Sequence, residues 1–259
     1  MKDIKVLVLG DVVRCASCEY MEKNLWKYRK ENDIDFVVVN GENSSGSGGI
    51  DKKSAETLLS AGADILTTGN HVFKSFEAKT LLDENKYILR PANYPDELPG
   101  FGYTLFDASG KTFLVMNVMG TVLMDPLSDP FSAIEKILEK NKGKYDISVL
   151  DIHAETTSEK RALGFYFDGR IDIIFGTHTH VETADEQILP KGTAYITDIG
   201  MCGPENSILG IEPSCVIEKL RMHIPTRFIV SENEIKAHGA IITIDRNKNT
   251  AKKIERITF

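Results

Sequence analysis

The side chains best suited to chemistry in this sequence are histidines, carboxylates and asparagines that follow short apolar runs. His178 and His180 lie one residue apart, directly after the apolar run 173–175 and Gly176. Imidazole is the commonest metal ligand among neutral side chains, and it exchanges protons near neutral pH. Most such pairs in soluble proteins lie in solvated loops, so the other polar residues must decide whether this pair binds a metal.

Four further apolar runs end in the same kinds of side chain. The runs 6–9, 36–39, 65–68 and 149–152 are followed, in turn, by Asp11, by Glu42 and Asn43, by Asn70 and His71, and by His153. Each residue alone has an ordinary explanation, since Asp11 could cap a turn and His153 could be a buried core histidine. The same placement at five strand ends, with four of the six histidines among them, favours one shared site.

The chemistry of this set points to metal ions. It offers carboxylate, imidazole and amide donors without a thiolate, which suits Fe, Mn, Zn or Mg and disfavours a structural zinc site. Seven candidates are too many for one four-coordinate ion but suit two ions that share Glu42, because a carboxylate has two oxygens. Two metals about 3.5–4 Å apart stabilise the entering and leaving oxygens of phosphoryl transfer and activate a bridging water. The pattern therefore predicts hydrolysis of a phosphoester.

Alternating segments predict the elements that position these residues. In the first half, strands at 4–9, 36–39, 64–68 and 87–89 alternate with helices at 19–30, 51–61 and 75–84, with Asp51 as the N-cap of the second helix. Strands separated by helices form right-handed crossovers in a parallel sheet. The second half adds a hairpin of 103–107 with 113–118, a helix at 131–139, a strand at 147–152, a helix at 158–166, strands at 173–175, 193–197 and 227–230, and a hairpin of 235–244 with 251–258.

Both halves contain apolar strands that must be buried. Two sheets packed face to face, with helices on the outside, would bury both sets in one α/β fold. Ligands of open α/β sheets bind beyond the carboxyl ends of the strands, and this is where the candidate residues fall. We expect one domain spanning residues 1–259, because two-sheet domains reach this length without splitting.

Composition limits the partners. The chain of 259 residues is 42% hydrophobic and carries a net charge of −7, so it can bury a full core and should not attract long nucleic acid or an anionic membrane. A local metal centre could still hold a small phosphodiester. Residues 1–10 lack the pattern of a signal peptide, and four cysteines are too few for a disulfide scaffold of this size, so we expect a cytoplasmic protein.

Several short motifs occur in an order that resembles a known family. They are Gly10-Asp11-Val12-Val13, Asn40-Gly41-Glu42-Asn43, Gly69-Asn70-His71, Arg90-Pro91-Ala92-Asn93 and the segments 153–160, 176–181 and 189–198. The set is similar to that of the calcineurin-like metallophosphoesterases and, more closely, of the bacterial YmdB family, almost from end to end. The resemblance implies a four-layered α/β/β/α fold and a 2′,3′-cyclic-nucleotide 2′-phosphodiesterase, which opens 2′,3′-cyclic nucleotides to 3′-monophosphates.

The resemblance also implies a role for each candidate. One metal would be held by Asp11, Glu42, Asn43 and His180, and the other by Glu42, Asn70, His153 and His178. A metal-bridging water would attack phosphorus, and His71 would protonate the leaving oxygen, a role that suits a pKa near neutrality. Iron is the metal most often linked with the family, and the same ligands also accept Mn, Mg or Zn.

One segment departs from the family pattern. Residues 14–18, Arg-Cys-Ala-Ser-Cys, stand where the family has glycine and small residues. We expect Arg14 to point to solvent rather than to bind phosphate. We expect no redox pair from Cys15 and Cys18, because the sequence shows no helix-after-strand setting there.

One alternative function stays open. A regulatory protein could bind a nucleotide and signal to a partner, with weak or incidental turnover. The presence of His71 favours catalysis, because a pure sensor needs no proton donor. The sequence leaves a homo-oligomer open as well.

Overall fold

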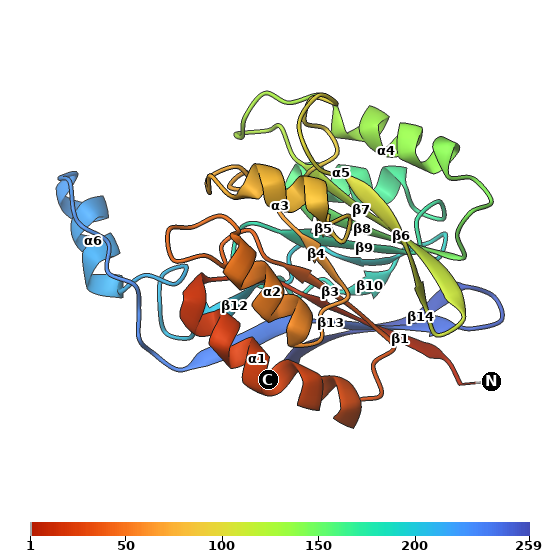
Figure 1. Ribbon diagram of the computed structural model, residues 1–259, viewed down its shortest axis with the longest axis horizontal. Coiled ribbons are helices and arrows are strands. Elements are labelled where there is room, and N and C mark those ends of the chain that lie inside the picture. Colours follow the sequence, from red (N-terminus) through yellow and green to blue (C-terminus); the bar gives the residue numbers. More distant parts are fainter. Residues whose placement is uncertain (1) are drawn as a thin grey trace.

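The computed structural model describes residues 2–259 and contains two β-sheets packed against each other (Figure 1). The first sheet has the strand order β2-β12-β13-β1-β3-β4-β5, with β14 paired to β13. Its strands are Ile4–Leu9 (β1), Asp11–Val12 (β2), Phe36–Asn40 (β3), Ile65–Thr67 (β4), Ile88–Leu89 (β5), Met201–Pro204 (β12), Ile235–Asp245 (β13) and Thr250–Thr258 (β14). The second sheet has the order β10-β11-β9-β8-β7-β6. Its strands are Tyr103–Ala108 (β6), Lys111–Met119 (β7), Ile147–His153 (β8), Ile173–Thr177 (β9), Gln187–Ile188 (β10) and Ala194–Ile196 (β11).

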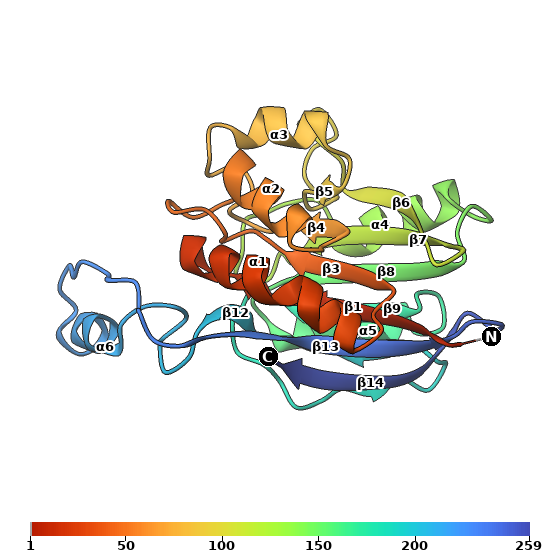
Figure 2. The same cartoon turned by 60° about the horizontal axis from the view of Figure 1, so that its bottom comes forward.

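Helices cover the outer faces of both sheets. Those on the first sheet are Arg14–Glu31 (α1), Lys52–Ser60 (α2) and Ala78–Glu84 (α3), and those on the second are Pro130–Lys140 (α4) and Thr157–Tyr166 (α5). Helix α6 (Pro213–Met222) projects from the body in both views (Figure 1, Figure 2). Within residues 2–259, no helix combines the length and the apolar character needed to span a bilayer.

Each sheet is buried on both faces, which explains its continuously apolar strands. In β1, Val6 and Val8 face the second sheet, whereas Leu7 and Leu9 face the helices. Strands covered on two sides are apolar throughout instead of alternating with polar residues. The order of layers, helix, sheet, sheet and helix, confirms the predicted four-layered α/β/β/α fold.

The strands that lead to the candidate ligands run parallel. β1, β3, β4 and β5 are parallel neighbours, and so are β7, β8, β9 and β11. The register places Asn40 beside Thr67 in the first sheet and His153 beside Thr177 in the second. The carboxyl ends of the strands therefore meet at one edge of each sheet, as predicted.

Local sequence signals predicted several elements correctly. Asp51 caps α2, because its Oδ1 accepts the Ser54 N–H at 2.8 Å while its own N–H donates to Ser54 Oγ at 3.1 Å. The hairpin of β6 and β7 closes across Ser109 and Gly110, whose φ angles are 49° and 73°. Two consecutive positive φ angles are typical of the tight turn that joins twisted antiparallel strands.

The strand predicted at 227–230 is wrong. Among the described residues, this segment pairs only through one bridge, between Ile211 and Val230. Phe228 and Ile229 are 44% and 57% exposed, and no strand within residues 2–259 lies beside them to extend a ladder. The segment follows helix α6 (Pro213–Met222) in the part of the chain that projects from the body. The sequence patterns did not predict this helix.

Helix α1 begins at Arg14, earlier than the predicted start at residue 19. Strand β2 precedes it directly, so the expectation that Cys15 and Cys18 lack a helix-after-strand setting is wrong. Burial raises the pKa of the Cys18 thiol to about 12, which disfavours the reactive thiolate. The partly exposed Arg14 donates its Nη1–H to Gly46 O at 2.7 Å and so ties the helix start to the loop after β3.

Candidate metal centre

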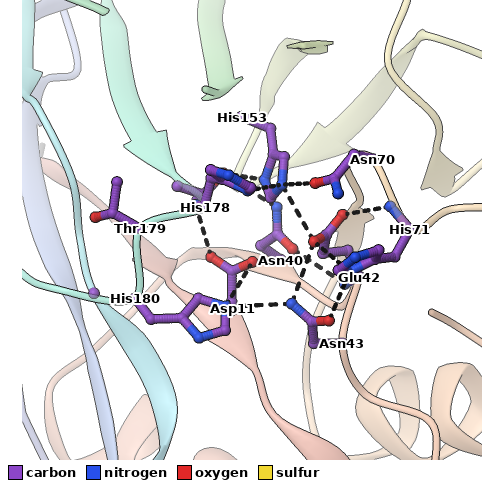
Figure 3. A network of polar contacts seen from close by, with 12 residues as sticks. Asp11, Asn40, Glu42, Asn43, Asn70, His71, His153, His178, Thr179 and His180 are labelled. Atoms are coloured by element: carbon purple, nitrogen blue, oxygen red, sulfur yellow. Dashed lines mark hydrogen bonds and ion pairs between the residues drawn. The ribbon is translucent and has the colours of Figure 1, made fainter. Parts of the chain in front are cut away.

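All seven predicted ligands lie together at the carboxyl ends of the strands (Figure 3). They come from β2 (Asp11), the loop after β3 (Glu42 and Asn43), the loop after β4 (Asn70), the end of β8 (His153) and the turn after β9 (His178 and His180). Ligand-type atoms of Glu42, His153 and His178 lie within 4.8 Å of one another. Each sheet supplies part of the cluster, because the two carboxyl edges lie at the same place.

His153 is the centre of one half of the cluster. Its Nε2 lies 3.2 Å from Glu42 Oε1 and 3.1 Å from Asn70 Oδ1. His178 Nδ1 lies 3.1 Å from the same Nε2 atom. Two oxygens and two ring nitrogens thus converge, and such donors can share one metal cation.

The other half contains Asp11, Asn43 and His180. His180 Nε2 lies 3.6 Å from Asp11 Oδ1 and 3.2 Å from Asn43 Nδ2. Asn43 Nδ2 also lies 3.2 Å from Glu42 Oε1, so Glu42 touches both halves. Within the described residues, Asp11 Oδ1 is buried without a hydrogen-bond partner, and such an oxygen is suited to a cation.

The charges of these groups favour a cation. Burial would raise the pKa of the Glu42 carboxyl, but His153 and His71 hold it well below its usual range. Burial also opposes ionisation of Asp11, yet the contact with His180 lowers its pKa. Burial disfavours the charged form of His153, but the neighbouring carboxylates, Glu42 first among them, raise its pKa to about 9. Two buried carboxylates that stabilise a proton in this way would also stabilise a metal ion.

A buried relay orients His153. His153 Nδ1 lies 2.9 Å from Thr177 Oγ1, which donates its proton to Asp151 Oδ1 at 2.7 Å. Because the hydroxyl proton is used there, Thr177 accepts from His153 Nδ1, and Nε2 of the neutral ring offers its lone pair to the cluster. Asp151 Oδ2 accepts from Asn40 Nδ2 at 3.0 Å and from Thr67 Oγ1. Burial raises the pKa of Asp151 to about 6.

His178 has a carboxylate partner on its far side. Its Nδ1 faces His153, and its Nε2 lies 3.0 Å from Glu155 Oε2. A carboxylate that accepts the Nε2 proton leaves the Nδ1 lone pair free for a metal.

His71 lies at the rim of the cluster. Its side chain is 38% exposed, compared with 1% for Glu42. Its Nδ1 lies 3.0 Å from Asn43 Oδ1 and 3.2 Å from Glu42 Oε1, and its backbone N–H donates to Glu42 Oε2 at 3.1 Å. Both oxygens can only accept, so Nδ1 carries a proton in these contacts and Nε2 is the ring nitrogen that they leave free.

The turn after β9 sends its two histidines to different halves of the cluster. His178 and His180 have φ angles of 96° and 61°, which residues other than glycine seldom adopt. Strand β9 ends at Thr177, so the rings do not share a face as they would on a continuing strand. His178 instead contacts His153, and His180 contacts Asp11.

Gly69 and Gly176 lie where other groups approach the backbone closely. Neither has a φ in the left-handed region, so the backbone conformation alone does not require glycine at either position. A Cβ at Gly69 would overlap the His153 ring and the Glu42 carboxylate. A Cβ at Gly176 would overlap the Thr197 carbonyl. Glycine is required at both positions because other groups occupy the space of a side chain.

Replacing Gly69 with alanine is expected to push His153 and Glu42 apart. We expect metal affinity to fall at least as far as the roughly 10–100-fold typical of disturbing the surroundings of metal ligands. Isothermal titration of EDTA-treated protein with Mn²⁺ measures this change. Gly46→Ala is the matched control, because a Cβ there would meet only the Cys15 sulfur at 3.5 Å. Wild-type affinity in Gly69→Ala would contradict the close packing of this site.

The sequence patterns did not reveal three residues that orient the cluster, namely Asp151, Thr177 and Glu155. Asp151 gave a usable signal, because a carboxylate inside the buried strand β8 must find polar partners. Thr177 and Glu155 gave no signal beyond lying next to predicted ligands.

Comparisons with known proteins find relatives along nearly the whole chain. The family described as YmdB-like protein matches residues 7–257. The 2′,3′-cyclic-nucleotide 2′-phosphodiesterase of Bacillus subtilis (strain 168) is 40% identical over 254 residues, which cover 98% of this chain and 96% of that protein. A putative phosphatase/phosphodiesterase of Mycoplasma pneumoniae is 35% identical over 265 residues, which cover 99% and 93% of the two chains.

Solved structures share the fold. A hypothetical protein from Thermus thermophilus superposes with a TM-score of 0.91 at 36% identity and covers 99% of both chains. A structure described as a novel phosphatase from Mycoplasma pneumoniae gives a TM-score of 0.91 at 34% identity and covers 100% of this chain and 94% of that one. A putative 5′-nucleotidase from Staphylococcus aureus, at 17% identity and a TM-score of 0.62, is similar in fold alone.

Proposed function

The chain belongs to the YmdB-like protein family, and from this membership we propose that it is a metal-dependent phosphodiesterase that opens 2′,3′-cyclic nucleotides to 3′-monophosphates. The activity is that of the Bacillus subtilis relative, which is similar along nearly the full chain. The observation that carries the proposal is the convergence of Glu42, His153 and His178 at the strand ends. Their donor atoms suit a metal that activates a phosphoester.

We assign two metals to two overlapping sets of ligands. Asp11, Glu42, Asn43 and His180 would hold one ion, and Glu42, Asn70, His153 and His178 would hold the other. Two observations support this fit: Asp11 Oδ1 has no hydrogen-bond partner among the described residues, and several donors converge around His153. Asn43 now turns its amide nitrogen toward His180, and a half-turn of the amide would present its oxygen there instead. Bound ions, for which we propose iron while the donors also accept Mn, Mg or Zn, would supply Lewis-acid activation of the phosphodiester and of water.

The chain's own residues supply the proton for the leaving group. Hydrolysis adds water across the P–O2′ bond, so a hydroxyl joins phosphorus and a proton must reach O2′. We assign that proton to His71 Nε2, because Glu42 Oε1 accepts from Nδ1 on the other side of the ring. The partial exposure of His71 lets the ring meet the substrate and then regain a proton from solvent.

Product analysis tests the proposal. Metal-free protein is loaded with Mn²⁺ or Fe²⁺ and incubated with 2′,3′-cyclic AMP, and the products are separated by chromatography. We expect 3′-AMP, because the P–O2′ bond breaks. Formation of 2′-AMP would contradict the assigned bond, and absence of any product with both metals would contradict the activity. A parallel incubation with 3′,5′-cyclic AMP is the control for selectivity toward the five-membered ring.

A further inference from the structure

A fully buried ion pair lies directly behind the turn that carries His178 and His180. Lys160 in α5 and Asp198 after β11 are 0% and 1% exposed, and Lys160 Nζ lies 2.6 Å from Asp198 Oδ2. Neither residue belongs to the proposed ligands or to the relay behind His153. The pair therefore needs a separate explanation.

The Asp198 carboxylate is directed at the middle of the turn. Its Oδ2 accepts the Thr179 N–H at 3.2 Å and the Thr179 hydroxyl at 2.8 Å, while its Oδ1 accepts the Gly200 N–H at 2.9 Å. Thr179 is the residue between the two histidines, and Figure 3 shows its side chain on the outer side of the cluster.

Two carboxylates hold successive backbone N–H groups of the turn. His178 N–H donates to Asp11 Oδ2, within the cluster, at 3.1 Å, and Thr179 N–H donates to Asp198 Oδ2 at 3.2 Å. A turn with positive φ at His178 and His180 persists only where its surroundings fix it. These two contacts provide that restraint.

Gly176 lets the lysine reach this position. A Cβ at Gly176 would lie 2.8 Å from Lys160 Cδ, in addition to its overlap with the Thr197 carbonyl. The lysine stem therefore crosses the backbone of β9 one residue before Thr177 and presents its ammonium group to Asp198.

The burial of this pair is poorly explained by stability alone. Taking two charges out of water costs about as much free energy as their attraction returns, and apolar residues of similar volume often serve the fold equally well. A charge-assisted hydrogen bond to Thr179, in contrast, holds its partner more firmly than a neutral one. The location of the pair therefore suggests that it fixes the conformation of the turn.

We propose that Lys160 and Asp198 are positioning residues that hold the His178-Thr179-His180 turn, through Thr179, in the conformation that binds both metals. The inference rests on the proposed metal ligands, since one turn supplies a histidine to each ion. Loss of the restraint lets the turn relax, and both histidines then leave the positions in which they meet their partners.

Thr179→Val tests this inference without touching a ligand or leaving a buried charge unpaired. Valine keeps the shape of threonine but loses the hydroxyl bond to Asp198, whereas Thr179→Ser keeps it. Thr112→Val is the matched control, because the Thr112 hydroxyl donates to the Asp107 carboxylate at 2.6 Å in the distant hairpin of β6 and β7. The measurement is Mn²⁺ titration of EDTA-treated protein, together with thermal unfolding in EDTA.

We expect Thr179→Val to bind Mn²⁺ about 10–100-fold more weakly, the range typical of residues that orient metal ligands, while Thr179→Ser and Thr112→Val bind like wild type. Unfolding in EDTA should be similar for all variants. Wild-type affinity in Thr179→Val would overturn the inference while leaving the proposed function intact. Failure of wild type and Thr112→Val to bind two ions would instead overturn the ligand assignment and the inference with it.

A double-mutant cycle tests the part played by the ion pair. Lys160→Met with Asp198→Asn removes both charges together, so neither is left buried alone. If the pair acts through Thr179, adding Thr179→Val to this variant should weaken Mn²⁺ binding by much less than Thr179→Val does in wild type. Fully additive losses would show that Thr179 acts independently of Lys160 and Asp198, and would overturn the inference.

Discussion

Replacing Glu42 with glutamine is expected to lower kcat/KM for 2′,3′-cyclic AMP by more than about 100-fold, beyond the loss typical of residues that only orient metal ligands. Glu42 is the one residue assigned to both metals, and its side chain is 1% exposed. Glutamine keeps its shape but loses the negative charge and one of the two acceptor oxygens. The metal content after gel filtration and the rate of 3′-AMP formation measure the two effects.

A carboxylate–imidazole contact away from the cluster provides the control for Glu42→Gln. Glu205 Oε1 lies 2.7 Å from His238 Nε2, outside the cluster. Glu205→Gln should therefore keep both metals and the wild-type rate. Retention of two tightly bound metals and normal turnover in Glu42→Gln would exclude a shared ligand at this position.

His71→Ala should lower kcat for 2′,3′-cyclic AMP by about 10²–10⁴-fold, the contribution of a positioned general acid. His71 is not an assigned ligand, but it contacts the ligands Glu42 and Asn43, so the assay is run at saturating Mn²⁺ and the metal content is measured on the same sample. The reason for the loss is chemical, since O2′ of ribose is a poor leaving group until it gains a proton. Steady-state kinetics of the metal-loaded variant measure kcat and KM separately.

The leaving group shows whether His71 acts as the proton donor. In bis(p-nitrophenyl) phosphate the leaving p-nitrophenolate is stable without protonation, so His71→Ala should lose far less activity on this substrate than on 2′,3′-cyclic AMP. Equal losses on both substrates would argue that His71 acts by holding Glu42 or Asn43 and not as an acid.

The fold and the membership of the cluster could be predicted because both follow from short-range patterns. Continuous apolar strands separated by helices specify parallel sheets covered on both faces, and parallel strands bring their carboxyl ends to one edge. Asp11, Glu42 and His153 follow such strands, so their meeting place is a consequence of the topology. Their proposed division between two metals comes from the family resemblance, because the composition of the site does not specify it.

The residues that orient the cluster depend on contacts across the fold, and the sequence does not specify these. Thr177 bonds Asp151, and Thr179 bonds Asp198, so each threonine of the Gly-Thr-His-Thr-His motif meets a buried carboxylate. Gly69 suggests a turn from its type alone, yet it is required because the His153 ring occupies the space of a Cβ. These requirements can be recognised only in the folded structure, where segments distant in the sequence lie side by side.

The strand predicted at 227–230, in the projecting part of the chain next to α6, is absent for a different reason. Its apolar residues, such as Phe228 and Ile229, are typical of a strand, but among the described residues no strand lies beside them to form a ladder. Strand preference reflects packing against neighbours more than an intrinsic preference of the backbone. Phe228 and Ile229 are accordingly left exposed.

The most direct test of the proposed two-metal phosphodiesterase is a stoichiometric titration of EDTA-treated wild-type protein with Mn²⁺ while 3′-AMP formation from 2′,3′-cyclic AMP is followed. Glu42 joins the two halves of the cluster, so we expect activity to rise mainly as the second equivalent of metal binds and to reach a plateau at two. Full activity without metal, or a plateau at one equivalent, would contradict the account.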